Sequence, residues 1–537
     1  MTKIINNKKL MFLILMTLAA SISAFLKNEN FFDFANYHYY NPWAFLNGRI
    51  GYDIAPASFL TFLNPLLDLP RYFTIIYFNQ HINLFYAING LWFGLLLFVF
   101  YQILTILYSS QNTQDSLWIV MTIAIAATGW MTWYQVGSST NEICLSFINF
   151  CGLFLLLKSL QSKNEQKLSS FILAGLILGA GLGLKVTNIT ICIAAGASLI
   201  IGYKWLSQPM KFIFLFAVAG LSGFLLTNGW WMYKLYTLYD NPFFPFLNNI
   251  FNSEYFQSTT ISTNDFVPSW KQLAVCPYLA IDGVICNSEG LTRDYRLQIF
   301  YTIAIGWLCY LFSGKKIKYY YQNKPTEFFF YSFFLLNYLL WAKMFGVQHY
   351  FIVIEMCGAV LLTQTLKFWY NTKKYKNIFY IITCGLFIYL LSTPIIEQNP
   401  NNMKGRDKII DVEQINLPKH TLIKLYNMPL AGLLPEIAKY NDDFRAVGLS
   451  SFIEVISSTG TDMTSNGKLK EKIDLLDQEY ANQVVFVRFS VNKRQADIIM
   501  NSIKKDLEGK NCRILKNSFA PIYGQPIYIC VPYEWQY

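Results

Sequence analysis

Long apolar runs alternate with short polar segments along the chain, and this alternation predicts most of its structure. About 20 apolar residues suffice for a helix to cross the ~30 Å hydrocarbon core of a bilayer. Such runs lie near residues 10–26, 82–107, 117–135, 143–157, 168–184, 189–203, 212–236, 297–313, 327–345, 347–366 and 377–394. The pattern predicts an α-helical polytopic membrane protein with about eleven spans. The short run 143–157 and the tight connection at 184–189 leave ten to thirteen spans open.

The pattern changes after residue 395, where strand-like and helix-like runs replace the spans. The strand-like runs are TLIKLYN, FRAVGLS, VVFVRFS, CRILKNSF and PIYICVPY, and the amphipathic helices are PLAGLLPEIAKY, KLKEKIDLLDQEY and KRQADIIMNSIKKDLEG. This alternation predicts a small α/β domain with a largely parallel sheet over 396–537, after a transmembrane domain over 1–395. The tail has neither GxGxxG nor GxxxxGK, so nothing in it predicts a nucleotide site.

Composition and charge agree with a membrane protein and indicate its orientation. The chain is 54% hydrophobic and only 14% charged, against roughly 25% charged in soluble domains. Its net charge of +11 comes from short lysine clusters between apolar runs, which does not favour nucleic-acid binding. Lysines are typical of cytoplasmic segments. Apart from the lysine-free loop 108–116, the segments on the same side as the amino terminus carry these lysines, which predicts a cytoplasmic amino terminus. The exterior segments are then 27–81, 136–142, 185–188, 237–296 and everything after 395.

The ten cysteines separate into two groups on this topology. Six lie inside spans, where a thiol packs as a small apolar group. The other four lie outside as two local pairs, Cys276 with Cys286 and Cys512 with Cys530. An oxidising exterior then predicts two disulfides. No cysteine or histidine spacing typical of a zinc site occurs, so no metal site is predicted from these residues.

A polar and aromatic stretch, FFDFANYHYYNPWAFLNGRIGYD, directly follows the first apolar run. This run resembles a signal peptide ending in SISA, but we interpret it as an uncleaved anchor because the later spans alternate correctly from it. A helix over Phe31–Asn47 brings one set of side chains onto a polar face by i, i+3, i+4, i+7 spacing, namely Asp33, Asn36, Tyr37 and Tyr40. On such a helix His38 points elsewhere, and Pro42 predicts a kink.

Asp33 is the candidate general base of this stretch. A carboxylate where a span meets an outer cavity is desolvated, which raises its pKa and suits proton removal from a hydroxyl. The alternative is structural: Asp33 or Asp53 caps a helix or pairs with Arg49. Glu142 and Glu355 are carboxylates near exterior span ends, and each either lines the cavity or pairs with a lysine of a neighbouring helix.

Three segments carry a resemblance to a known family: DFANYHYYNPWAFLNGRIGYDIAPASFLTFLNPLLDLP, NGWWMYKLYTLYDNPFFPFLNNIFNSEYF and FGVQHYFIVIEM. Together with the first-loop carboxylate and the exterior tail, they resemble bacterial members of the GT-C superfamily of integral-membrane glycosyltransferases. The resemblance covers most of 10–395. One departure is His349-Tyr350, where the family pattern has an Arg-Tyr pair.

The resemblance implies transfer of a sugar from a polyprenyl-phosphate donor to a glycan or lipid acceptor on the periplasmic face of the bacterial inner membrane, in cell-surface glycan assembly. Asp33 is then the base. A lipid phosphate needs cations, and the candidates near exterior span ends and loops are Lys185, Arg293, Arg296, Lys343, His349 and Arg49. The alternative for each is snorkelling to lipid headgroups. A divalent metal is compatible with this chemistry but not required by it, and no other cofactor is expected.

Two other functions stay open at this point. A lipid-linked glycan polymerase or ligase also acts on polyprenyl-linked saccharides, but usually through an arginine-rich exterior loop, and exterior arginines before the tail are few here. A non-enzymatic flippase needs polar residues along its span interiors. Here the polar residues gather at exterior span ends, and release of polyprenyl phosphate in a purified assay distinguishes an enzyme from a flippase.

Overall fold

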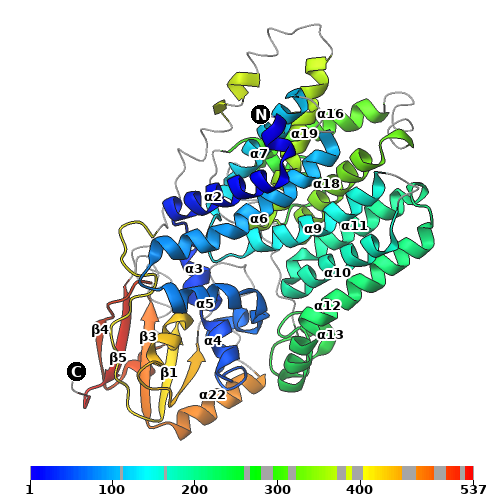
Figure 1. The fold of residues 1–537 in the computed structure, drawn as a ribbon. Helices are drawn as coiled ribbons and strands as arrows, with labels where there is room; N and C mark the ends of the chain where they lie inside the picture. Colours follow the sequence, from blue (N-terminus) through cyan, green and yellow to red (C-terminus); the bar gives the residue numbers. More distant parts are fainter. Residues whose placement is uncertain are drawn as a thin grey trace. The chain divides into compact units, whose positions relative to one another are not determined.

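The computed structural model describes residues 2–108, 113–161, 166–258, 267–279, 294–312, 322–371, 383–386, 388–389, 403–449, 467–488, 503–519 and 526–535 (Figure 1). Contacts divide the chain into two compact units. The first comprises Met1–Asn28, Tyr86–Asn228 and Thr263–Asn402, and the second Glu29–Phe85, Gly229–Ser262 and Met403–Tyr537. The predicted domain boundary near residue 395 separates the tail from the loops 27–81 and 237–296. The contacts instead place the tail in one unit with most of 27–81 and part of 237–296.

Helices account for nearly all regular structure of the first unit. Those that coincide with predicted spans are α2 (Lys8–Leu26), α6 (Ile82–Tyr108), α7 (Thr113–Ala127), α9 (Glu142–Leu160), α10 (Leu168–Leu184), α11 (Ile189–Ile201), α12 (Pro209–Tyr239), α16 (Arg296–Phe312), α18 (Pro325–Met344) and α19 (Ile352–Asn371). In the described part of the chain, five helices are long and apolar enough to cross a membrane: Lys8–Leu26, Ile82–Tyr108, Glu142–Leu160, Pro209–Tyr239 and Gln348–Asn371. They indicate a helical membrane protein.

The number of spans stays a prediction. The last predicted run, 377–394, lies mostly outside the described residues. The predicted run 117–135 is interrupted, because α7 ends at Ala127 and the short helix α8 (Trp130–Tyr134) begins after Gly129. A Cβ atom at Gly129 would lie 2.1 Å from the carboxyl carbon of Glu355, so a side chain at this position would displace the Glu355 carboxylate.

Glycines also bring α10 and α12 into close backbone contact. A Cβ atom at Gly179 would lie 1.9 Å from the carbonyl oxygen of Gly220, and one at Gly223 would lie 2.1 Å from that of Leu176. Small residues are typical of helix pairs in membranes, where close approach of the backbones replaces the hydrophobic driving force. A larger side chain at Gly179 or Gly223 would separate the two helices.

A five-stranded mixed sheet forms the centre of the second unit. Its strands are β1 (Thr421–Tyr426), β2 (Phe444–Gly448), β3 (Asn482–Arg488), β4 (Lys510–Ile514) and β5 (Ile527–Pro532), in the order β2-β1-β3-β5-β4. All five coincide with predicted strands. β1 pairs in parallel with β2 and β3, whereas β5 runs antiparallel to β3 and β4. The sheet is therefore less parallel than predicted, because two of its four strand pairings, β3 with β5 and β5 with β4, are antiparallel.

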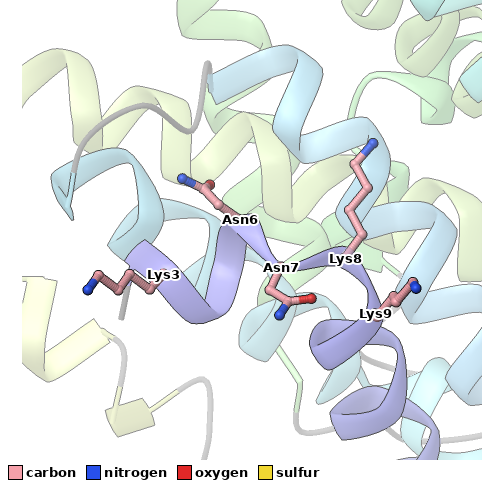
Figure 2. A pocket seen from close by; sticks show the side chains of 5 residues that line it. All are labelled: Lys3, Asn6, Asn7, Lys8 and Lys9. Atoms are coloured by element: carbon pink, nitrogen blue, oxygen red, sulfur yellow. The ribbon is translucent and has the colours of Figure 1, made fainter.

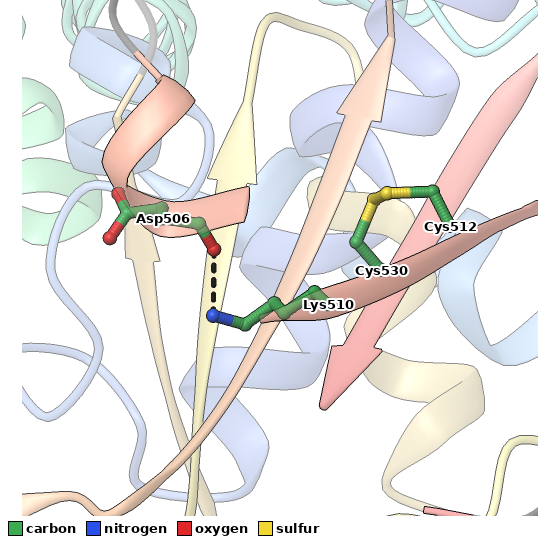
Figure 3. The surroundings of a disulfide bond; sticks show 4 residues. All are labelled: Asp506, Lys510, Cys512 and Cys530. Carbon is green, nitrogen blue, oxygen red and sulfur yellow. Dashed lines mark hydrogen bonds between the residues drawn. A yellow bond between two sulfur atoms is a disulfide. The ribbon is translucent and has the colours of Figure 1, made fainter. Parts of the chain in front are cut away.

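The antiparallel strands β4 and β5 carry the predicted tail disulfide. Cys512 and Cys530 lie opposite each other in the register of β4 and β5, with their Cα atoms 4.0 Å apart and their sulfurs bonded (Figure 3). Next to this pair, the Lys510 ammonium donates to the backbone carbonyl of Asp506 at 2.6 Å. The tail disulfide is thus confirmed, whereas Cys286 of the other predicted pair lies outside the described residues.

Candidate functional site

Asp33 lies at a change of helix type in the segment 27–81, which the sequence predicts to be exterior. The helix α3 (Phe31–Asp33) passes into a π-helix, η1 (Phe34–His38), and α4 (Tyr40–Leu46) follows. Asn30 caps the start, because its side-chain oxygen accepts the Asp33 amide at 3.4 Å while its Nδ2 donates to Asp33 Oδ2 at 2.8 Å. The carboxylate is therefore held in one orientation. π-Helical turns inside longer helices are rare and frequently lie at functional sites.

The predicted polar face does not form, because the π-helix changes the α-helical spacing on which it depended. Asp33 is partly exposed, but Asn36, Tyr37 and Tyr40 are buried. Asn36 Nδ2 donates to the Met428 sulfur at 3.5 Å, and the Tyr37 ring packs on His38 with centroids 4.0 Å apart. These three residues therefore pack inside the second unit.

Each other carboxylate of residues 27–81 is buried with a partner. Glu29 pairs with Arg71 at 2.5 Å, Asp53 with Arg49 at 2.7 Å, and Asp68 with His38 at 2.6 Å. Their exposed fractions are 0%, 2% and 4%. Asp33 is thus the one carboxylate of residues 27–81 with an accessible side chain.

Arg49 and Asp53 form an ion pair, which is the structural alternative that the sequence left open to a role in the site. Arg49 Nε and Nη2 each donate to the Asp53 carboxylate at 2.7 Å, and Tyr40 donates to the same carboxylate at 2.9 Å. Burial and the neighbouring Asp53 charge raise the pKa of Tyr40 well above its usual value. Arg49 also donates to the Phe444 carbonyl at 2.8 Å and lies over the Phe444 ring. These contacts anchor the first loop on the strand β2.

In the first unit, Glu142 and Lys185 form an ion pair at neighbouring helix ends. Glu142 begins α9, and Lys185 follows α10. The Lys185 ammonium also lies 3.4 Å from the Thr140 carbonyl oxygen and 5.2 Å from the centre of the Tyr350 ring. His349 is partly exposed, and its backbone carbonyl accepts Gln135 Nε2 at 3.0 Å. The structure therefore brings Lys185, Glu142 and the 349–350 turn together. Glu142 pairs with a lysine, which is the structural alternative given for it.

A second charged group of the first unit gathers at the start of α8. Asp294 Oδ2 accepts the Trp130 amide at 3.1 Å, and Glu355 Oε2 accepts the amide and hydroxyl of Thr132 at 2.9 and 2.6 Å. Arg296 Nε lies 3.4 Å from Asp294 Oδ2, and its side chain is 2% exposed. Glu355 is thus held by backbone and hydroxyl donors of α8, and the lysine pairing that the sequence left open for it is not among these contacts.

The remaining cation candidates differ in how they are placed. Lys343 donates to the Pro268 carbonyl at 2.6 Å and lies over the Trp270 ring, so it packs the 267–273 segment against α18. Arg293 lies outside the described residues. Three lysines that were not among the predicted candidates, Lys3, Lys8 and Lys9, line a hollow with Asn6 and Asn7 at the amino terminus. Figure 2 shows their ammonium groups pointing in different directions, so they do not converge on one anion.

No three His, Cys, Asp or Glu side chains gather as a possible metal site within the described ranges. The predicted residues fall into two groups. Asp33, Asn36, Tyr37, His38, Tyr40, Arg49 and Asp53 belong to the second unit, and Glu142, Lys185, Arg296, Lys343, His349 and Glu355 to the first. Each unit therefore brings together a subset of the predicted site.

Sequence reasoning did not find several partners of these residues. Asn30 beside Asp33 has a recognisable signal, because an asparagine three residues before the capped position is typical of a helix start. Asp68 and Glu436, which bind His38 and Tyr39, lie 30 and 397 residues away from them. No spacing rule connects residues at such separations.

Comparison with known proteins adds no family assignment. No protein-family model matches the chain, and no curated protein matches it significantly.

Proposed function

We propose that this chain is a membrane glycosyltransferase of the GT-C type, which transfers a sugar from a polyprenyl-phosphate donor to a hydroxyl of a glycan or lipid acceptor. The reaction takes place on the exterior face, in cell-surface glycan assembly at the bacterial inner membrane. The apolar helices and the resemblance of the first loop support this proposal. The observation that carries it is the partly exposed Asp33 carboxylate, held by Asn30 where its three loop neighbours are buried and paired.

The chemistry is an inverting single displacement. Asp33 removes the proton of the acceptor hydroxyl, the acceptor oxygen bonds to the anomeric carbon, and the carbon–oxygen bond to the phosphate breaks with its electron pair leaving on polyprenyl phosphate. A positive group stabilises this leaving phosphate. Within the first unit, Lys185 keeps a side-chain exposure of 16% against 2% for Arg296, so Lys185 is the more accessible of these two candidate cations.

The test is an assay of purified protein in lipid nanodiscs with tritiated polyprenyl-phosphate hexoses and a lipid extract as the acceptor source. Wild-type protein should release polyprenyl phosphate and label the acceptor. Asp33→Asn keeps the shape of the side chain but cannot take up the proton, so transfer should fall by about 10²–10⁴-fold while donor binding persists. Asp407→Asn changes an exposed aspartate of the same unit and serves as the matched control.

Two results would count against the proposal. A wild-type protein that releases no polyprenyl phosphate from any hexose donor is not this enzyme. Full transfer by Asp33→Asn removes Asp33 from the role of base and leaves its cap with Asn30 as its function.

A further inference from the structure

The second unit joins the first exterior loop to the carboxyl ends of the parallel strands of the tail. Three contacts attach η1 and its flanks to the chain that follows β1. Asn36 Nδ2 donates to the Met428 sulfur, the Tyr39 hydroxyl donates to Glu436 Oε1 at 2.7 Å, and Gly432 lies against the backbone of Ala35. Met428 follows β1 by two residues, Gly432 lies in the turn η10 (Ala431–Leu433), and Glu436 lies in α21 (Leu434–Ile437).

Gly432 makes the closest of these contacts. A Cβ atom at this position would lie 2.6 Å from the carbonyl oxygen of Ala35 and 3.0 Å from its carbonyl carbon. Both are backbone atoms of η1, which cannot rotate away as a side-chain tip can. A side chain at residue 432 therefore forces η1 and η10 apart, and Asp33 is the residue directly before η1.

A second attachment lies at the edge strand of the sheet. The Ile54 amide donates to the Ala446 carbonyl and the Gly448 amide to the Ile54 carbonyl, both at 2.9 Å, so the loop adds one residue of β pairing to β2. The Asp53 carboxylate accepts the Ala446 amide at 2.9 Å. The loop is thus fixed to the sheet on both sides of α4.

Ligands of open α/β sheets bind outside the carboxyl ends of the strands, where the strand order reverses. In this sheet the order β2-β1-β3 places that reversal between β1 and β3, beside the carboxyl end of β1. The segment that follows β1 packs against η1, a part of the same chain. The tail therefore uses this position to hold the loop.

We propose that the C-terminal sheet is part of the catalytic unit, with Gly432 and Glu436 as positioning residues that set where the Asp33 carboxylate lies. This inference rests on the proposed function. A displacement of about 1 Å in a catalytic group can cost about 10²-fold in rate. The tail thus acts on the reaction through η1.

Gly432→Ala tests the closest contact. It should lower kcat by about 10²-fold and leave the KM for the tritiated polyprenyl-phosphate hexose unchanged, because it moves the base and not the donor site. Gly306→Ala is the matched control, since no atom lies within 4 Å of a Cβ at that helical glycine. The control should transfer at the wild-type rate.

Glu436 provides a second test that does not depend on how well Gly432→Ala folds. Glu436→Ala leaves the buried Tyr39 hydroxyl without its acceptor and should lower kcat. Glu436→Gln keeps a side-chain oxygen for this hydrogen bond and should restore most of the rate. In both variants the KM for the tritiated donor should stay at the wild-type value. A merely structural role for Glu436 would not lower kcat while leaving KM unchanged.

Asp33→Asn measured alongside separates the two proposals. An active Asp33→Asn overturns the base assignment, whatever the tail variants do. An inactive Asp33→Asn together with wild-type kcat in both Gly432→Ala and Glu436→Ala overturns the role of the tail alone.

Discussion

Asp68 Oδ1 lies 2.6 Å from Nδ1 of His38, and both side chains are buried. A carboxylate that faces Nδ1 accepts a hydrogen bond from the N–H at that position. Nε2 is buried without a hydrogen-bond partner in the part of the chain that the structure describes. The pair thus fixes the ring plane of a histidine at the end of η1.

Asp68→Ala should destabilise the protein, because it leaves the buried imidazole N–H without its acceptor. The expected cost is about 1–3 kcal/mol. Asp68→Asn retains an oxygen that accepts from Nδ1–H and should cost less. Thermal unfolding in detergent measures both, and equal midpoints for Asp68→Ala and wild type would show that the contact contributes nothing to stability.

The disulfide between Cys512 and Cys530 should stabilise the tail. It closes a loop with a sequence separation of 18, and the chain-entropy account gives about 3 kcal/mol for loops of this size. The double variant Cys512→Ser/Cys530→Ser should therefore unfold at a lower temperature than wild type. Cys309→Ala removes an exposed free thiol and is the control. A wild-type midpoint in the double variant would contradict the expectation.

Asp506 should make the stability of the tail depend on pH in the acid range. Burial raises its pKa, but hydrogen bonds from Lys424 and Tyr426 outweigh burial and hold the pKa of Asp506 below its usual value. The unfolded state then binds more protons near the ordinary aspartate pKa of about 3.9. The contribution is therefore fully present above this value and is lost as the pH falls through the lower folded pKa.

Asp506→Asn removes this titration. Between pH 5 and pH 3, roughly the window around the ordinary pKa, the wild-type midpoint should fall more steeply than that of Asp506→Asn. Asp407→Asn, at an exposed aspartate, should keep the wild-type slope. Parallel curves for wild type and Asp506→Asn would rule out Asp506 as the titrating group.

The lysine distribution predicts a cytoplasmic amino terminus and an exterior tail. Reporter fusions after residue 320 and at the carboxyl terminus should therefore score opposite sides, with residue 320 in the cytoplasm. An alkaline phosphatase and a fluorescent protein, active on different sides, give complementary readouts. The same side for both fusion points would refute the predicted topology.

The sequence by itself determined where most helices and strands lie, because hydrophobic periodicity is a local property of the chain. The apolar runs from 10–26 to 347–366 coincide with helices, and the strands from β1 to β5 coincide with the strand-like runs. The tail disulfide was predicted from the placement of two cysteines on neighbouring strand-like runs of a predicted exterior segment, and the register of β4 and β5 brings them opposite each other.

Only the tertiary structure decided what the polar residues do. The π-helix at Phe34–His38 changed which side chains lie beside Asp33, and the residue types of FANYH do not predict a π-helix. Tyr39 meets Glu436 across 397 residues, and Ile54 pairs with β2. Local pattern cannot identify such partners, because a buried charge or hydroxyl is satisfied by whichever group the folded chain brings within hydrogen-bond distance.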